Sequence, residues 1–210
     1  MGLARNDIYR RCVLQMRIIA GTAKGMTLFS VKGDGTRPTT DFVKENLFNI
    51  IRDDLRGEDF LDLFTGTGAV GIEALSRGAR AACFVDISPK SLAVVKRNLE
   101  KAGFGARALV VKGDASRAVN KLAGRKFKLI FLDPPYFVDL AEKSLGMIVQ
   151  QDILARDGYI VLEMSKEEAV PMVGGLVVLR EKEYSGTRLV FYGLGHERTE
   201  HNDCSVSGQL

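Results

Sequence analysis

Cysteine and histidine, the residues that most often form disulfides or hold structural metals, are scarce in this chain. Its 210 residues include three cysteines, which are odd in number and widely spaced, and two histidines without a surrounding motif: Cys12, Cys83, Cys204, His196 and His201. Such spacing does not support a disulfide framework or a zinc site. The sequence therefore predicts reduced thiols in a cytoplasmic protein and no metal centre.

The chain also lacks a long apolar segment. No run approaches the roughly 20 apolar residues that a membrane-spanning helix requires. Residues 1–15 contain charges and no apolar centre, so they do not resemble a secretory signal. With 46% hydrophobic and 27% charged residues, the composition is typical of one soluble globular domain. We expect a monomer with a disordered leader (1–15), a basic arm (16–38), a main domain (39–195) and a disordered tail (196–210).

Positive charge is unevenly distributed. The formal net charge is +4, and residues 1–44 alone hold eight Lys or Arg against three Asp. Extended segments at 16–20 and 26–31, separated by glycines, predict a hairpin-like arm that carries Arg17, Lys24 and Arg37. A basic arm on a near-neutral body is typical of a polyanion partner, although ordinary solvated cations would produce the same pattern.

The most informative stretch is Phe60-Leu-Asp-Leu-Phe-Thr-Gly-Thr-Gly-Ala-Val-Gly-Ile-Glu-Ala-Leu75. It predicts a buried strand, a glycine-rich turn and a helix that begins near Ala69. Gly66 and Gly68 allow the backbone to approach a ligand and to adopt positive φ angles. Unpaired N–H groups at the helix start would point toward that ligand.

The spacing of Gly66, Gly68 and Gly71 matches the dinucleotide-binding fingerprint, so a nicotinamide enzyme is one candidate. Asp86 ends the next apolar run, 20 residues after Gly66. At this separation, a carboxylate on the second strand accepts hydrogen bonds from ribose hydroxyls. The two features together favour a ligand that contains adenosine without identifying it.

Strands alternate with helices through most of the chain. Strands are expected at 60–64, 81–85, 109–111, 127–132 and 159–162, with a hairpin over 176–194; helices are expected after Asp41 and over 69–75, 89–103, 116–123 and 139–154. This order predicts an α/β fold with a doubly wound, mostly parallel, seven-stranded Rossmann-like sheet that ends in an antiparallel hairpin. Asp62, Asp86, Asp114 and Asp133 all fall at or beside carboxyl ends of strands, where such sheets bind ligands.

A second informative stretch is Ile130-Phe-Leu-Asp-Pro-Pro-Tyr136. Proline has no backbone N–H, so Pro134 and Pro135 make a rigid turn that presents only acceptors beside the Asp133 carboxylate. Tyr136 adds an aromatic face. The combination predicts a site that accepts hydrogen bonds from a planar amino group and stacks the ring that bears it.

These motifs resemble the S-adenosylmethionine-dependent amino-methyltransferases of class I fold: Asp62-x-x-x-Gly66-x-Gly68, Asp86, Gly113-Asp-Ala115 and Asp133-Pro-Pro-Tyr136. Met16-Arg-Ile-Ile-Ala-Gly21, Lys24-Gly25, Arg37-Pro-Thr-Thr-Asp41 through Asn49, and Leu61-Asp-Leu-Phe64 narrow the resemblance. They resemble the bacterial small-subunit (16S) ribosomal RNA guanine-N2 methyltransferases. The resemblance covers about residues 16–194, so the main domain would be the methyltransferase domain.

The resemblance implies a role for each matching residue. The cofactor S-adenosylmethionine would contact Asp62, Thr65, Gly66, Thr67, Gly68, Asp86, Ile87, Asp114 and Ala115. Asp133 and the Pro134 carbonyl would bind the exocyclic amine of the target guanine, with Pro135 stiffening the turn and Tyr136 stacking on the base. The partner would be small-subunit ribosomal RNA or an assembling 30S subunit, contacted through Arg17, Lys24 and Arg37, with no metal and no membrane involved.

Other functions remain open at this point. An amino-methyltransferase of this type could instead act on adenine or cytosine in DNA, or on a protein glutamine. The glutamine enzymes typically carry Asn where this chain has Asp133, and a DNA enzyme would usually need a separate recognition domain. A nicotinamide dehydrogenase would leave the Asp-Pro-Pro-Tyr turn without a role, and a non-catalytic RNA-binding module would retain the sheet alone.

Overall fold

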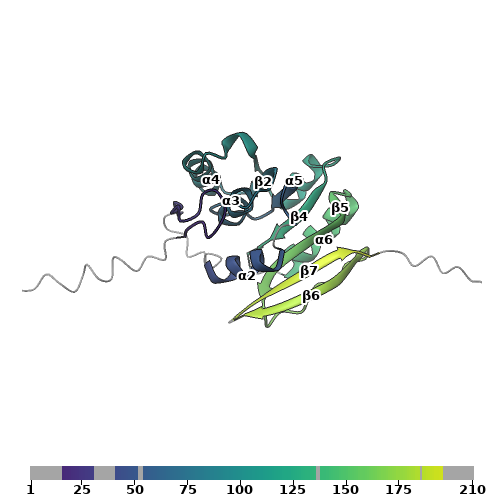
Figure 1. Ribbon diagram of the computed structural model, residues 1–210. Coiled ribbons are helices and arrows are strands. Elements are labelled where there is room, and N and C mark those ends of the chain that lie inside the picture. The colour runs from purple at the N-terminus through teal and green to yellow at the C-terminus, as the bar shows by residue number, and fades with distance from the viewer. Residues whose placement is uncertain (1–15, 31–40, 52–53, 136–137, 185, 196–210) are drawn as a thin grey trace, which may run out of the picture.

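The computed structural model describes residues 16–30, 41–51, 54–135, 138–184 and 186–195. A seven-stranded sheet with the order β3-β2-β1-β4-β5-β7-β6 runs through its centre (Figure 1). The strands are β1 (Asp59–Asp62), β2 (Ala81–Asp86), β3 (Ala108–Lys112), β4 (Phe127–Leu132), β5 (Leu154–Ser165), β6 (Leu176–Tyr184) and β7 (Thr187–Leu194). Neighbours among β1 to β5 pair in parallel, whereas β7 pairs antiparallel with both β5 and β6. The predicted fold class is confirmed.

Both faces of β1, β2 and β4 are buried, because apolar side chains alternate between two cores. Phe60 of β1 belongs to the first core and Leu61 to the second. Along β4, Phe131 belongs to the first core and Ile130 to the second. Continuous apolar strands of this kind require helices on both faces of the sheet.

The helices are α2 (Asp41–Ile51), α3 (Ala69–Ser76), α4 (Pro89–Ala102), α5 (Ala115–Lys121) and α6 (Val138–Gln150), with a short 3₁₀ turn η1 (Gly105–Arg107). Apolar residues of α2, α3 and α4 contribute to the first core, and those of α5 and α6 to the second. The ends of α4 follow directly from sequence. The Ser88 hydroxyl accepts a hydrogen bond from the Ser91 N–H, Pro89 is the first helical residue, and Gly103 ends the helix with φ 72°.

The boundary between α6 and β5 differs from the expected one. The helix predicted to continue to Leu154 ends at Gln150, and the strand predicted to begin at residue 159 already begins at Leu154. Asp152 turns the chain with a φ of 49°, which an apolar periodicity does not reveal. Leu154 then pairs with Phe127, ahead of a register shift in the β4–β5 ladder.

Residues 16–30 form the predicted arm as two antiparallel segments. They share one bridge, between Arg17 and Thr27. Around it, the Ile18 N–H donates to the Met26 carbonyl at 2.9 Å and the Leu28 N–H to the Met16 carbonyl at 2.8 Å. The pairing stays short because side chains of α3 and α4, described below, accept the neighbouring N–H groups. The expected leader, the tail and residues 31–40, which include the rest of the expected arm, lie outside the described residues.

Candidate active site

The carboxyl edge of the sheet brings four acidic residues together, as predicted. Asp62 ends β1 and Asp86 ends β2, while Asp133 follows β4 directly and Asp114 lies two residues beyond β3. These four strands are consecutive in the sheet, and the strand order reverses between β1 and β4. Doubly wound sheets bind ligands at such a switch point.

Asp62 is the most buried of these acids, with 2% of its surface exposed. Its Oδ2 accepts hydrogen bonds from the Thr65 hydroxyl at 2.8 Å and from the Gly71 N–H at 3.0 Å. Burial raises the pKa of Asp62 to about 7, against the lowering effect of these two donors, and the charges of Asp133 and Asp86 raise it further. The carboxylates of Asp133 and Asp86 therefore act electrostatically on the carboxylate of Asp62.

The glycine-rich turn adopts the conformation that its sequence predicts. Gly66 and Gly68 have φ angles of 52° and 80°, and Gly68 is the N-cap of α3. Gly71 is needed for packing: a Cβ there would lie 2.4 Å from Cε1 of Phe84 on β2. The third glycine of the motif thus allows α3 to pack closely on the sheet, with its N-terminus at the rim.

Asp86 holds the glycine turn against β2. One carboxylate oxygen accepts the Gly66 N–H at 2.9 Å, and the other accepts the Ser88 N–H at 2.7 Å. Each oxygen retains a lone pair for a further donor. Ile87, beside it, is 68% exposed, which is unusual for a large apolar side chain at the end of a buried strand. An exposed apolar residue at this place is available to cover a flat ring.

Asp114 has a structural contact at the next strand end. It is the N-cap of α5, where its carboxylate accepts the Arg117 N–H at 2.9 Å and pairs with the Arg117 guanidinium at 3.4 Å. The Gly113 N–H donates to the Asp86 carbonyl, which joins the two strand ends. Ala115 is buried behind the cap. The predicted contact of Asp114 with adenine stays a prediction.

The diproline turn starts where β4 ends. Asp133 and Pro134 are half-buried and Pro135 is exposed. The Leu63 N–H donates to the Phe131 carbonyl at 3.0 Å, which continues the β1–β4 contact up to the turn. This places the turn beside the glycine loop, consistent with the effect of Asp133 on Asp62. Tyr136 lies outside the described residues, so its stacking role stays a prediction.

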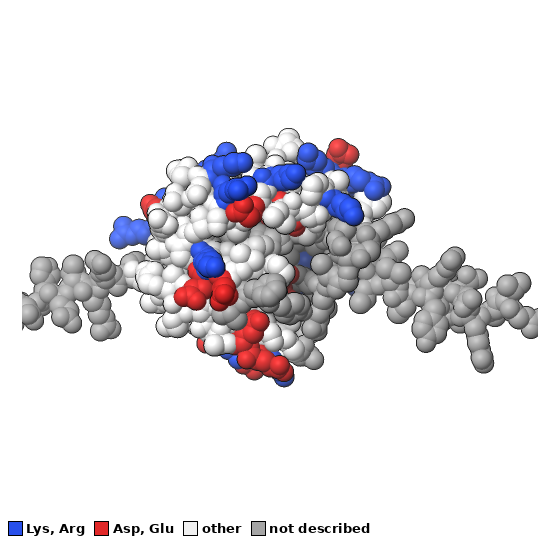
Figure 2. All heavy atoms as spheres, turned by 180° about the vertical axis from the view of Figure 1, so that it is seen from behind, with Lys and Arg blue, Asp and Glu red and all other residues white. Residues whose placement is uncertain are grey.

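The predicted cations of the arm are exposed: Arg17 and Lys24 both reach solvent, whereas Arg37 lies outside the described residues. In Figure 2, most of the visible Lys and Arg lie over the upper part of the molecule, with a few acidic residues among them, whereas acidic residues predominate lower down. The upper part contains α4 and α5 (Figure 1). Their exposed cations are Lys90, Lys96, Arg97, Lys101, Arg117 and Lys121.

The sequence alone did not identify Glu73, the side chain that holds the arm in place. Glu73 of α3 is fully buried and accepts the Ile19 and Ala20 N–H groups at 2.8 and 3.0 Å. Its carboxylate also pairs with Arg77 at 2.8 Å and lies 3.8 Å from the buried Lys44 ammonium. A single glutamate inside the apolar run of α3 is the one signal that pointed to this role, since a buried charge requires partners.

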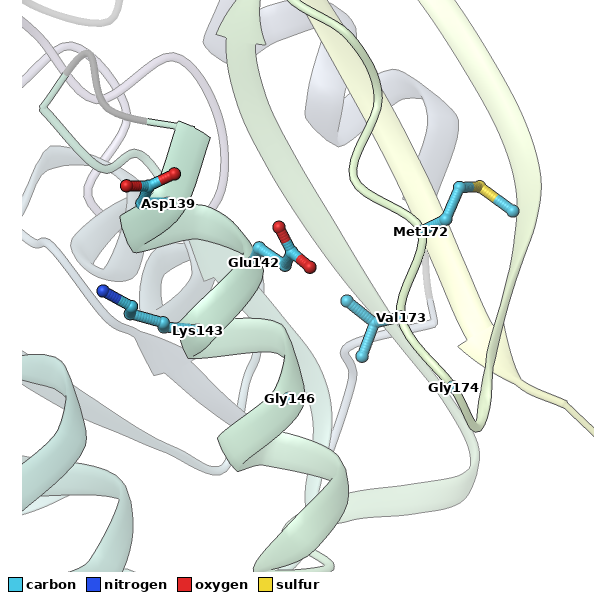
Figure 3. A pocket seen from close by; sticks show the side chains of 7 residues that line it. All are labelled: Asp139, Glu142, Lys143, Gly146, Met172, Val173 and Gly174. Atoms are coloured by element: carbon cyan, nitrogen blue, oxygen red, sulfur yellow. The ribbon is translucent and has the colours of Figure 1, made fainter.

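A groove of about 450 Å³ lies between α6 and the loop before β6 (Figure 3). Its lining is Asp139, Glu142, Lys143, Gly146, Met172, Val173 and Gly174. In Figure 3, Glu142 and Val173 face one another across it, while Met172 points away from the helix. None of the predicted site residues lines this groove, and its two carboxylates disfavour a phosphate ligand.

Within residues 16–30, 41–51, 54–135, 138–184 and 186–195, no helix is long and apolar enough to cross a membrane. The same residues contain no group of three His, Cys, Asp or Glu side chains arranged to hold a metal ion.

A family model and several known proteins that are similar to this chain indicate the same family. The family model described as "Conserved hypothetical protein 95" matches residues 16–193. The Bacillus subtilis (strain 168) protein named "Putative rRNA methyltransferase YlbH" is 43% identical over 180 residues, covering 84% of this chain and 98% of that protein. "Ribosomal RNA small subunit methyltransferase D" of Escherichia coli (strain K12) is 31% identical, covering 82% of this chain and 86% of that protein.

A solved structure is also similar to this chain in both fold and sequence. The Escherichia coli protein described as "Putative methyltransferase yhhF" has a TM-score of 0.77 to this chain at 32% identity, covering 86% of this chain and 98% of that one. The residues matched by the family model, 16–193, include the arm, the glycine turn and the diproline turn. The chain therefore belongs to the family of the ribosomal RNA small subunit methyltransferase D.

Proposed function

We propose that this protein is an S-adenosylmethionine-dependent methyltransferase that modifies the exocyclic N2 amine of a guanine in small-subunit ribosomal RNA. The relatives named above support the reaction class and the RNA substrate. The guanine specificity rests on the resemblance of the diproline turn and the arm to the guanine-N2 enzymes.

The position of Asp62 next to the diproline turn is the observation that supports this proposal most strongly. The buried Asp62, at the end of β1, pairs in register with Phe131 of the neighbouring β4, two residues before Asp133 and the diproline turn. The glycine turn and the N-terminus of α3 lie beside the same strand end. A group bound by the first carboxylate would therefore lie next to a group bound by the second, as transfer between two ligands requires.

The residues on the donor side fit S-adenosylmethionine. Oδ2 of Asp62 accepts both hydrogen bonds described above, so Oδ1 is left for the ammonium of the methionine part. Asp86 retains acceptor capacity for ribose hydroxyls, and the exposed Ile87 would cover the adenine ring. When bound, S-adenosylmethionine supplies a methyl group that its sulfonium already activates.

On the acceptor side, the chain has to present a weak nucleophile, because the lone pair of a guanine amine is delocalised into the ring. The Asp133 carboxylate and the Pro134 carbonyl would accept the two N–H groups and direct the nitrogen lone pair at the methyl carbon. The nitrogen–carbon bond forms as the sulfur–carbon bond breaks, and the proton shed by the nitrogen leaves to Asp133 or to water. Turning the base out of its stack costs a few kcal/mol, which stacking on Tyr136 would offset.

The arm and α4 provide the cations for RNA. Arg17 and Lys24 project from the arm, and four exposed cations line α4. Backbone contacts of this type give binding that weakens as salt is raised. They would hold the RNA while the diproline turn selects the base.

The test is methyl transfer from labelled S-adenosylmethionine to small-subunit particles isolated from cells that lack the enzyme, followed by nucleoside analysis. N2-methylguanosine is the expected product. Methylated adenosine or cytosine would overturn the guanine assignment, and label on protein would favour a glutamine substrate. Binding of NADH in place of S-adenosylmethionine by calorimetry would support a dehydrogenase instead.

A further inference from the structure

Asn98 of α4 joins the arm to the glycine turn. Its side chain is fully buried. Oδ1 accepts the Phe29 N–H at 2.7 Å, and Nδ2 donates to the Phe29 carbonyl at 3.1 Å and to the Thr67 carbonyl at 2.9 Å. One amide thus binds the second segment of the arm and the centre of the proposed cofactor loop.

The first segment of the arm reaches the same loop residue. The Thr67 hydroxyl contacts the Met16 sulfur at 3.6 Å. Thr67 lies between Gly66 and Gly68, which both have positive φ angles. Glycines on both sides make this peptide easy to reorient. It is held by two hydrogen bonds, from Asn98 Nδ2 to the Thr67 carbonyl and from the Gly68 N–H to the Thr65 carbonyl at 2.8 Å. If Asn98 only satisfied arm backbone groups, its bond to the Thr67 carbonyl would not be needed.

The same segment of the arm also contacts two cations of α4. The Arg97 guanidinium lies 4.2 Å and the Lys101 ammonium 5.0 Å from the centre of the Phe29 ring. Lys101 also donates to the Thr27 carbonyl at 2.6 Å. RNA that binds these cations would therefore act on the arm segment that Asn98 holds.

We propose that Asn98 is a positioning residue that couples RNA binding at the arm and α4 to cofactor binding at the glycine turn. Glu73 already holds the first segment of the arm, and RNA contact with Arg97 and Lys101 adds a hold on the second segment at Phe29. Asn98 and Met16 then fix the Thr67 peptide, and the turn is set for the cofactor. Such coupling is reciprocal, so each ligand raises the affinity for the other by the same factor. This inference rests on the proposed function, because it requires both ligands.

The test measures the ratio of two dissociation constants for S-adenosylhomocysteine, one without and one with the RNA substrate. The dissociation constant of labelled S-adenosylhomocysteine is determined by equilibrium dialysis, with and without saturating small-subunit particles from cells lacking the enzyme. For the native protein, the particles should lower this constant by about 5- to 150-fold, the usual range of such coupling. A variant that loses the coupling should give a ratio near one, even if its affinity for S-adenosylhomocysteine alone also changes.

Two variants address the contact. Asn98→Asp keeps the size of the side chain and the acceptor for the Phe29 N–H, but replaces the donor to the Thr67 and Phe29 carbonyls by an acceptor. Thr67→Val keeps the shape of the side chain and removes the hydroxyl contact with Met16. Asn120→Asp, at an exposed position of α5, is the matched control. Thermal melting establishes that each variant is folded; if Asn98→Asp is not, Asn98→Ala, which also removes the bond to the Thr67 carbonyl, decides.

The outcomes separate the two proposals. A ratio near one in the folded variants, with the native ratio in Asn120→Asp, supports the role of Asn98. A native-like ratio in the folded Asn98 and Thr67 variants overturns it, as does a native protein that binds S-adenosylhomocysteine equally well with and without particles. A native protein that does not bind S-adenosylhomocysteine at all contradicts the proposed function itself.

Discussion

Replacing Asp62 with asparagine should make the folded protein more stable above neutral pH while abolishing cofactor binding. The pKa of Asp62 is raised from its ordinary value of 3.8 to about 7. The unfolded chain therefore releases this proton at a lower pH than the folded protein does. Above pH 4 the folded state binds more protons at this site, so stability is lost as the pH rises toward 7.

The size of the effect follows from the pKa difference. One pKa unit corresponds to about 1.36 kcal/mol, so the full shift amounts to about 4 kcal/mol. About 2.5 kcal/mol of this falls between pH 5 and pH 8, because the carboxyl is already ionised in the unfolded chain at pH 5. The asparagine oxygen still accepts from Thr65 and Gly71, so the variant keeps the local hydrogen bonds.

The measurement is urea denaturation of the native protein and Asp62→Asn at several pH values from 5 to 8. The free energy of unfolding of the native protein should fall relative to the variant by about 2.5 kcal/mol across this range and then level off. The affinity of the native protein for S-adenosylmethionine should rise toward pH 7, since binding an ammonium favours the ionised carboxylate. A constant difference between the two proteins would refute the raised pKa and the role derived from it.

Three further changes test other parts of the structure. Gly71→Ala should lower the free energy of unfolding by about 1–3 kcal/mol in urea titrations, because its Cβ would collide with Phe84. Glu73→Gln should cost about 3 kcal/mol in the same assay, since it leaves the buried Lys44 and the half-buried Arg77 without this counter-charge. Lys24→Ala should reduce the salt dependence of RNA binding by about one unit of log–log slope, and Lys182→Ala on β6 should leave it unchanged.

Much of the fold was predictable because residues near the ends of the helices and strands determine where these elements begin and end. Ser88, Pro89 and Gly103 fix both ends of α4, and the apolar runs bounded by glycines fix the parallel strands. The positive φ of Asp152 was not predictable, because an aspartate can end a helix in several conformations. The start of β5 was therefore misplaced.

The candidate site was predictable in its positions and not in its contacts. Parallel strands necessarily place Asp62, Asp86 and Asp133 at one edge. Sequence spacing does not show that Asp86 also holds the Gly66 N–H, or that Asp62 is buried deeply enough for its pKa to rise. The link through Asn98 was equally hidden, because its partners are backbone atoms far away in the sequence.

The central claim is that Asp133 presents the acceptor nitrogen to a methyl group held beside Asp62. It is tested most directly by single-turnover methyl transfer from labelled S-adenosylmethionine to small-subunit particles, comparing Asp133→Ala with Asp139→Ala, which removes an exposed carboxylate of α6. Loss of the Asp133 acceptor should lower the rate by about 100-fold or more in Asp133→Ala, with a native rate in Asp139→Ala. A native rate in Asp133→Ala would contradict the account.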